Sequence, residues 1–93
     1  MAILVIAEFP GMTVEQDKAM TEATNIANDP PPGVRARFAG PTDAGWRIMS
    51  VWDSRDAWDA FLHDRLTPAL QRAGRSVPDF QVSPLESVFM PQR

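Results

Sequence analysis

The stretch V-W-D-S-R-D-A-W-D-A-F-L-H-D-R-L, residues 51–66, contains two of the chain's three tryptophans and its one histidine. It begins as the end of an extended segment and continues past Ser54, a good helix N-cap, into apolar positions three and four residues apart. A strand therefore leads directly into an amphipathic helix, whose apolar face comprises Ala57, Trp58, Phe61, Leu62, the aliphatic stem of Arg65, Leu66 and Ala69. The placement of these aromatic side chains decides both the core and any pocket.

Upstream of this junction, the chain begins with a strand and a helix. Residues 2–9 are apolar and rich in β-branched side chains and are followed by Pro-Gly, which predicts a strand near the middle of a sheet. Thr13 and Gln16 have the spacing of a capping box. The helix that they start is predicted to run to Ala27, with an apolar face of Val14, Ala19, Met20, Ala23, Ile26 and Ala27.

Two further strands are predicted between the proline-rich segment and residue 52. Residues 34–39 alternate in polarity, so Val34, Ala36 and Phe38 are expected on one face and two arginines, Arg35 and Arg37, on the other. Residues 40–45 (G-P-T-D-A-G) predict a turn of a length that joins antiparallel neighbours. Residues 46–52 should then pair with residues 34–39 as a hairpin.

The end of the second helix is predicted from Pro68 and Gly74. Because proline lacks a backbone donor and clashes with the preceding turn, the helix should kink or restart there, with Thr67 as a new cap and Gly74 as the stop. A polar linker, residues 75–79, then precedes a last strand formed by Phe80, Val82 and residues 85–89. Pro84 restricts this strand to an edge or a bulge.

The predicted order β-α-β-β-α-β is the ferredoxin-like split arrangement of the α+β class, a four-stranded antiparallel sheet with both helices on one face. We expect residues 1–93 to form a single domain. A chain this short has a thin core, and the uncovered face of the sheet still contains apolar residues. Two copies are therefore expected to pack sheet against sheet as a homodimer.

Composition removes several classes of function. The chain has no cysteine, which excludes disulfides and thiolate metal sites and fits a reducing cytoplasm. A formal net charge of -3 argues against nucleic-acid binding. The apolar start of the chain meets Glu8 and Pro10 too early for a signal peptide or a membrane span. No phosphate loop or dinucleotide fingerprint is present, so no cofactor is predicted.

The run Val51-Trp52-Asp53-Ser54, followed by Ala57-Trp58 and Phe61-Leu62, together with the order of elements, resembles the antibiotic-biosynthesis-monooxygenase-like (ABM-like) family of the dimeric α/β-barrel superfamily. In that family a tryptophan ends the third strand, a serine or threonine caps the next helix, and aromatic residues follow. The resemblance implies a homodimeric barrel with a pocket between sheet and helices in each subunit. It also implies that Trp52 lines the pocket. Some relatives oxidise aromatic polyketides or quinols without a metal or flavin.

The candidate substrate-binding residues come from both sides of the junction. Trp46, Ser50 and Trp52 share strand parity and therefore one face of the sheet. Trp58 and Phe61 lie on the apolar face of the following helix. Filling the core explains all of these aromatic residues at least as well as binding a ligand does. The two interpretations overlap, because a pocket wall is also packed.

His63 and Glu8 are the candidate catalytic residues. Histidine gains and loses a proton near neutral pH, and His63 lies one turn from Asp59, which allows a pair between them. Without a second ligand nearby, His63 does not predict a metal site. Glu8 would be a proton acceptor if its face of the first strand met the pocket, and an ordinary solvated carboxylate otherwise. Ion pairs to Asp43 or Asp53, or across the dimer, explain the hairpin arginines as well as an anionic ligand does.

Two functions from different classes follow. The first is a small-molecule-binding homodimer whose pocket takes a hydrophobic or aromatic compound, with cofactor-independent monooxygenation of a quinol-type compound as its leading chemistry. The second is a non-catalytic ligand-binding or assembly protein, whose interior can be filled by its own aromatic side chains. A catalyst needs a reachable cavity with at least one polar group, whereas an assembly module can be solid.

Overall fold

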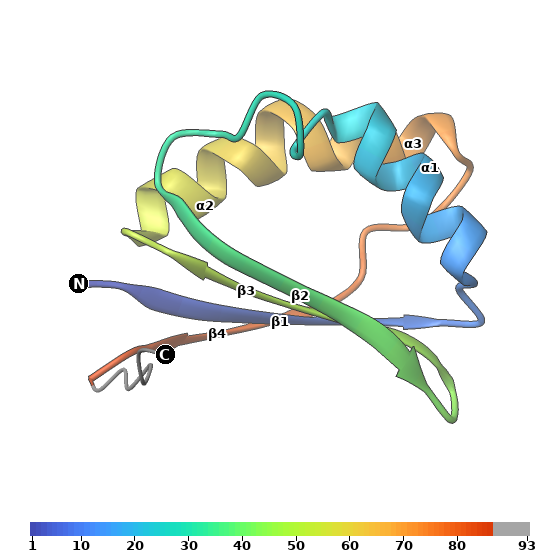
Figure 1. Ribbon diagram of the computed structural model, residues 1–93, viewed down its shortest axis with the longest axis horizontal. Helices are drawn as coiled ribbons and strands as arrows, with labels where there is room; N and C mark the ends of the chain where they lie inside the picture. The colour runs from blue at the N-terminus through green and yellow to red at the C-terminus, as the bar shows by residue number, and fades with distance from the viewer. Residues whose placement is uncertain (87–93) are drawn as a thin grey trace, which may run out of the picture.

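The computed structural model describes residues 1–86. The elements are β1 (Ile3–Pro10), α1 (Val14–Thr24), β2 (Val34–Thr42), β3 (Gly45–Trp52), α2 (Arg55–Phe61), η1 (Leu62–Leu66), α3 (Thr67–Arg72) and β4 (Phe80–Pro84). The four strands form one antiparallel sheet in the order β2-β3-β1-β4, and the helices cover one face of it (Figure 1). The predicted α+β, ferredoxin-like fold is confirmed.

The core lies between the helices and the inner face of the sheet. On β1 alternate residues are buried, and these are Ile3, Val5, Ala7 and Phe9. β3 contributes Trp46, Ser50 and Trp52 to the same face, as strand parity predicted. The helices close the core with Met20, Trp58, Phe61, Leu66 and Leu70.

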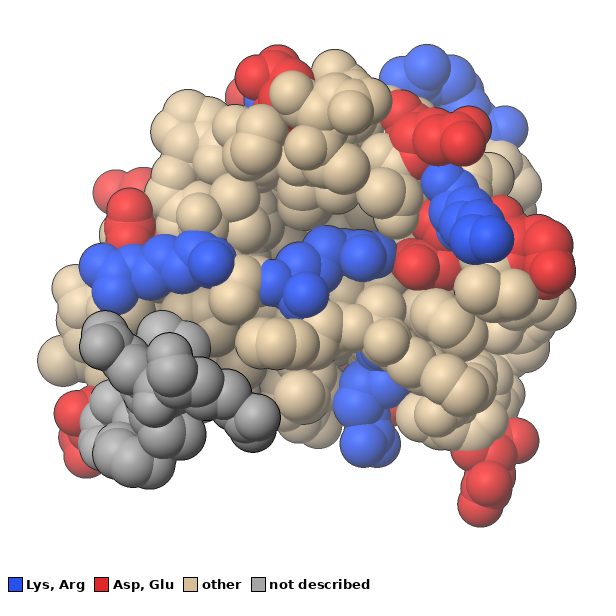
Figure 2. Space-filling model, viewed as in Figure 1, with Lys and Arg blue, Asp and Glu red and all other residues tan. Residues whose placement is uncertain are grey.

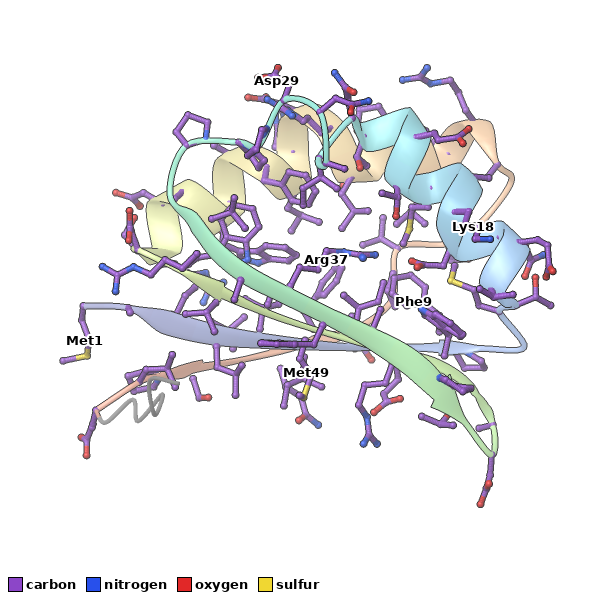
Figure 3. All side chains as sticks on the ribbon, in the orientation of Figure 1. Met1, Phe9, Lys18, Asp29, Arg37 and Met49 are labelled. Atoms are coloured by element: carbon purple, nitrogen blue, oxygen red, sulfur yellow. The ribbon has the colours of Figure 1, made fainter. Side chains whose placement is uncertain are left out.

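No helix of residues 1–86 lies on the opposite face of the sheet, which we call the open face (Figure 1). Its apolar members are Leu4, Ile6, Phe38, Met49 and Val51, which meet across the strand pairs Leu4–Val51, Ile6–Met49 and Phe38–Met49. Phe38 is 57% exposed. In Figure 3, Phe9 and Arg37 lie on the helical side of the sheet, whereas Met49 lies on the open side.

The hairpin between β2 and β3 is longer than predicted. The expected turn over residues 40–45 is reduced to Asp43 and Ala44, because β2 continues to Thr42 and β3 begins at Gly45. Thr42 stabilises the turn by accepting a hydrogen bond from the backbone N–H of Gly45 at 3.1 Å. β2 tolerates Pro41 because it is an edge strand, where a missing backbone donor costs little.

α1 begins as predicted but ends early. Thr13 and Gln16 form the capping box, with bonds of 3.2 and 2.9 Å. The helix stops at Thr24 instead of reaching Ala27, because Asn25 adopts the left-handed conformation at φ 55°. Its buried residues are Asp17, Met20 and Thr24. The predicted apolar face was therefore largely wrong, and Val14, Ala19 and Ala23 are exposed.

The second helical segment does not restart at Pro68. It passes from α2 through a π-helical turn, η1, into α3, and the N–H of Thr67 donates to the carbonyl of Leu62 five residues earlier. The wider turn absorbs the proline, whose ring would clash with the carbonyl of residue 64 in a regular α-helix. Thr67 has helical dihedral angles and makes no capping bond, so its predicted role as a cap was wrong.

The boundaries around the second helical segment match the predictions. Ser54 caps α2 by accepting a bond from the N–H of Ala57 at 3.1 Å. Gly74 ends α3 at φ 73°, and the N–H of Arg75 donates to the carbonyl of Leu70, as in a Schellman motif. β4 is an edge strand that ends at Pro84. The predicted continuation of this strand into residues 85–89 is wrong for Leu85 and Glu86, which follow its end, and its remaining part, beyond residue 86, lies outside the described residues.

Candidate functional site

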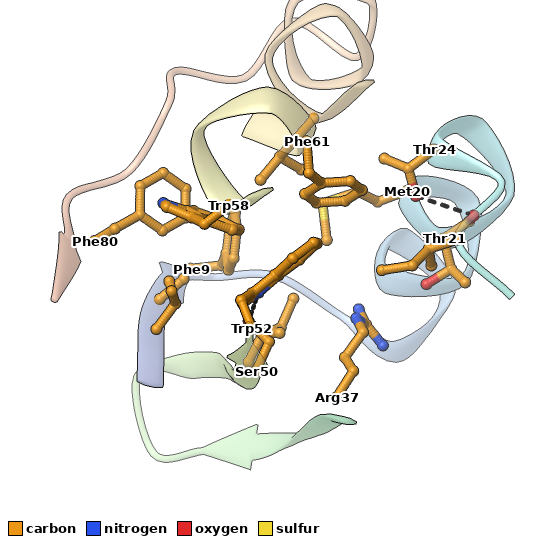
Figure 4. Close-up of a pocket in the computed structure, with 15 residues that line it drawn as sticks. Phe9, Met20, Thr21, Thr24, Arg37, Ser50, Trp52, Trp58, Phe61 and Phe80 are labelled. Atoms are coloured by element: carbon orange, nitrogen blue, oxygen red, sulfur yellow. Dashed lines mark hydrogen bonds between the residues drawn. The ribbon is translucent and has the colours of Figure 1, made fainter. Parts of the chain in front are cut away.

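A cavity lies between the inner face of the sheet and the helices. Both layers contribute to its wall: Val5 and Phe9 from β1 and Ser50 and Trp52 from β3 in the sheet, and Met20 and Thr24 from α1. Figure 4 shows Ser50 and Trp52 approaching the space from the sheet, and Met20 and Thr24 from the helical side. Figure 2 shows that the surface is hollowed between helices and sheet, so the cavity opens on this side of the molecule.

Aromatic rings form one end of the cavity. The ring of Trp52 packs edge-on against Trp58, with 5.5 Å between centroids and 61° between planes. The ring centroid of Phe61 lies 5.1 Å from that of Trp52, and the ring centroid of Phe80 from β4 lies 5.0 Å from that of Trp58. Edge-to-face packing of this kind stabilises the wall and also suits contact with a planar ligand. Four of the five predicted substrate-binding residues, Ser50, Trp52, Trp58 and Phe61, are thus brought together here.

Ser50 and Trp52 form the polar contact beneath the rings. The indole Nε1 of Trp52 donates to the hydroxyl of Ser50 at 2.9 Å, and both residues are buried. They are two residues apart on β3, so their side chains leave the same face of the strand. The bond satisfies a donor that would otherwise be buried unpaired, and it holds the indole plane in place.

Trp46 is the predicted substrate-binding residue that does not line the cavity. It is buried opposite Phe9 in the β1–β3 pair, at the other end of the same face of β3. Its Nε1 has no hydrogen-bond partner among the described residues. Trp46 therefore packs in the core near the end of the β2–β3 hairpin.

Neither predicted catalytic residue reaches the cavity. Glu8 lies on the open face, where it pairs with Arg47 from β3. His63 has a side chain that is 90% exposed and contacts Asp64 at 3.0 Å. The predicted Asp59–His63 pair is wrong, because Asp59 accepts from Arg55 at 3.1 Å. Within one chain, the geometry supports neither residue as an acid or base for a ligand in this cavity.

The cavity holds one charged side chain that the sequence pattern placed elsewhere. A β-bulge between Val34 and Ala36 inserts one extra residue into β2, so Arg37 faces Ser50 and Phe38 faces Met49. Arg37 therefore points inward and Phe38 outward, the reverse of the predicted alternation. Arg35, at the bulge, pairs with Asp53, as expected for a hairpin arginine.

Asp17 of α1 forms an ion pair with Arg37. Its Nη2 donates to Oδ1 of Asp17 at 2.8 Å, and the two side chains are 24% and 11% exposed. An acidic residue one turn before Met20 on the buried face of a helix requires a partner, because an unpaired buried charge is costly. Asp17 was therefore the sequence signal that could have revealed a cation on the inner face of the sheet.

The free space inside the cavity is limited. The wider space that includes the open mouth is about 460 Å³, but the cavity volume is only about 40 Å³. By that measure about three waters fit inside. A cavity that binds benzene measures about 150 Å³, so even a one-ring ligand would need side chains to move here. Met20 is the adaptable member of the wall.

Residues 1–86 contain no cluster of three or more histidine, aspartate or glutamate side chains arranged to hold a metal ion. Over the same range, no helix has both the length and the apolar character needed to span a bilayer.

Similar folds occur among solved structures. SnoaB from Streptomyces nogalater, a cofactor-independent oxygenase solved as a point mutant, superposes with a TM-score of 0.70 at 13% identity, over 94% of this chain and 95% of that one. Rv0793 from Mycobacterium tuberculosis gives a TM-score of 0.70 at 18% identity, covering 96% and 100%. A candidate antibiotic biosynthesis monooxygenase from Chloroflexus aurantiacus J-10-fl gives 0.63 at 17%, covering 98% and 100%.

At these identities the likeness establishes the fold, which is the one expected from the ABM-like resemblance. No family model matches the sequence, and no curated protein matches it either.

Proposed function

We propose that this protein is a homodimer that binds a small aromatic molecule in the cavity of each subunit and oxygenates a quinol-type compound without a cofactor. The observation that carries the proposal is the aromatic-lined cavity, within a fold that the cofactor-independent oxygenase SnoaB also has. Trp52, Ser50, Trp58 and Phe61 are the proposed ligand contacts. The cytoplasm is the proposed compartment, because a chain without cysteine suits it.

The proposed reaction needs no electron donor beyond the substrate. An ionised quinol can pass electrons directly to O₂ and combine with it; loss of water then leaves a hydroxylated quinone. One oxygen atom enters the product as the new hydroxyl group, and the other leaves as water with two hydrogens from the substrate. The protein has to hold the ring in place and stabilise its anion. Proton transfer by His63 or Glu8 is not part of the proposal, because both side chains lie outside the cavity.

The homodimer is proposed from the open face. Leu4, Ile6, Phe38, Met49 and Val51 form a continuous apolar surface on the side of the sheet that no helix covers. Contiguous apolar surface of this kind is unusual on a monomer and is typical of interfaces. A second copy presents the same surface, so a twofold sheet-to-sheet contact would cover both.

Oxygen uptake with methylhydroquinone tests the proposal. We expect the protein to consume O₂ faster than the quinol oxidises alone, and labelled O₂ to deliver one atom to the hydroxyquinone. Trp52→Phe should lower this rate about tenfold or more, because it loses the bond to Ser50 and displaces the ring that positions the substrate.

Trp46→Phe is the matched control, because it makes the same change at a buried tryptophan outside the cavity. It should leave the rate within about twofold of the parent, as expected for a site remote from the chemistry. Uptake equal to the protein-free rate over a series of quinols, or an equal loss in both variants, would contradict the proposed activity.

The second candidate is a non-catalytic ligand-binding or assembly protein. The specific observation in its favour is the small volume of the cavity, about 40 Å³. An interior that its own aromatic rings nearly fill stabilises the fold and need not admit a substrate. If the protein is non-catalytic, we expect Trp52→Phe to change the free energy of unfolding, and we expect no quinol to be consumed.

A further inference from the structure

Arg37 is the one charged residue among those that line the cavity of the described chain. Its side chain reaches the cavity from β2, beside Trp52 and facing Thr21 of α1 (Figure 4). Placing a guanidinium next to aromatic rings in a largely buried position is costly unless its donors are satisfied. The position of Arg37 therefore requires an explanation beyond packing.

The backbone of β2 is arranged to bring Arg37 inside. Without the bulge between Val34 and Ala36, strand alternation would leave Arg37 on the open face and Phe38 in the core. The bulge instead exposes a phenylalanine and buries most of an arginine, which is the less favourable exchange for stability alone. Bulges often serve to re-aim a side chain at a functional site.

Asp17 orients the guanidinium without occupying the cavity. It accepts one N–H of Arg37 at 2.8 Å, and that is the only hydrogen bond of the Arg37 side chain among the described residues. Asp17 does not line the cavity, whereas Arg37 does. Since a guanidinium carries five N–H donors, several are left for a partner on the cavity side.

The cavity has two chemically different ends. Trp58, Phe61 and Phe80 form an apolar end, and Arg37 with Thr21 and Thr24 forms a polar end next to α1. A planar ring fits the first, and an ionised oxygen would accept charge-assisted hydrogen bonds at the second. A ligand that matches both ends carries its charged oxygen directly on, or next to, an aromatic ring.

We infer that Arg37 makes the cavity selective for aromatic compounds that carry an ionised oxygen, as a phenolate, enolate or carboxylate does. The inference rests on the proposed ligand-binding function and names the class of ligand within it. Arg37 binds the oxygen, and Asp17 acts as a positioning residue that fixes the guanidinium.

Binding of a charged and a neutral probe of the same shape tests this inference. Benzoate and benzamide have one ring each and therefore require the least movement of the cavity wall, and quenching of the tryptophan fluorescence reports binding. We expect the parent protein to bind benzoate about tenfold or more tightly than benzamide, which is the effect of one charge-assisted hydrogen bond. Arg37→Gln should remove this preference while benzamide still binds.

Removing Arg37 alone leaves the carboxylate of Asp17 unpaired in a largely buried position, which lowers the stability of the single variant. The double variant Arg37→Gln/Asp17→Asn removes both charges and keeps the test valid. Arg35→Gln is the matched control, because it removes the same charge from the same strand at a 60% exposed side chain. It should retain the preference for benzoate.

Each outcome decides the inference. It is overturned if the parent protein shows no preference, if neither probe binds, if the double variant keeps the preference, or if Arg35→Gln loses it equally. A preference that depends on Arg37 in a protein that consumes no quinol supports the inference and contradicts the oxygenase proposal. Quinol turnover with the same KM in the parent and the double variant supports the oxygenase proposal and contradicts the inference about Arg37.

Discussion

Arg37 and Phe38 are adjacent in the chain, and each lies in the environment that was expected for the other. The charged side chain is 24% exposed beside the cavity, and the aromatic one is 57% exposed on the open face. No property of either residue alone causes this exchange. It follows from one additional residue in the β2 ladder, since a shift of one position reverses every side chain beyond it.

Trp52 is the most enclosed aromatic residue of those described, with 1% of its surface exposed, and its indole N–H donates to Ser50. Ser50→Ala would leave the Nε1 donor buried and unpaired, so we expect the free energy of unfolding to fall by about 1–3 kcal/mol. Urea unfolding measures this change. Ser83→Ala on β4 is the control, because Ser83 is exposed and should change stability by less than about 0.5 kcal/mol.

The same pair allows a double-mutant cycle. In a Trp52→Phe background the indole donor is absent, so adding Ser50→Ala should cost far less than it does in the parent protein. Equal costs in both backgrounds would mean that Ser50 stabilises the fold by packing and not through its bond to Trp52.

At the scale of elements, the end of the β2–β3 hairpin packs directly against the exit of β1. A Cβ atom at Gly45 would lie 2.4 Å from the backbone nitrogen of Gly11 and 2.4 Å from the carbonyl oxygen of Phe9. The N–H of Gly11 also donates to the carbonyl of Ala44 at 2.8 Å. The close approach of these two backbones therefore depends on glycine at position 45.

Gly45→Ala should consequently destabilise the protein by about 2 kcal/mol or more, because backbone atoms cannot move aside as a flexible side chain can. Thermal or urea unfolding measures the loss. Gly40→Ala is the matched control on β2, since a Cβ atom there meets nothing within 4 Å. It should be neutral within about 0.5 kcal/mol. Equal effects at the two positions would show that the contact with β1 is not what constrains Gly45.

At the scale of the whole molecule, the helices of the described part of the chain cover one face of the sheet, and none of them lies on the open face (Figure 1). Phe38 is the most exposed of the large apolar residues on the open face. If two copies pack through this face, Phe38→Glu introduces a charge into the interface. We expect the dimer dissociation constant to rise about a hundredfold, which is typical of burying an unpaired charge. Sedimentation over a range of concentrations measures it.

Val14→Glu is the control for this change. Val14 is 43% exposed on α1, away from the open face, so the same charge there should leave the dimer intact. A parent protein that stays monomeric at tens of micromolar would contradict the proposed homodimer. Dissociation by both variants would point to an interface other than the open face.

The sequence by itself determined the elements and their order. The capping box of Thr13 and Gln16, the Ser54 cap, the stop at Gly74 and the edge strand at Pro84 were predicted and are confirmed, because each depends on interactions within a few residues. The shared face of Trp46, Ser50 and Trp52 follows from strand periodicity in the same way.

Only the tertiary structure decided which charges face the cavity. The bulge in β2 is a mismatch between two strands, and the π-helical turn that absorbs Pro68 adjusts a whole helix, so neither is encoded in a short run of residues. The pairing of Arg37 with Asp17 joins β2 to α1 across the core. Periodicity describes how one segment alternates, whereas the contents of the cavity depend on how several segments are set against one another.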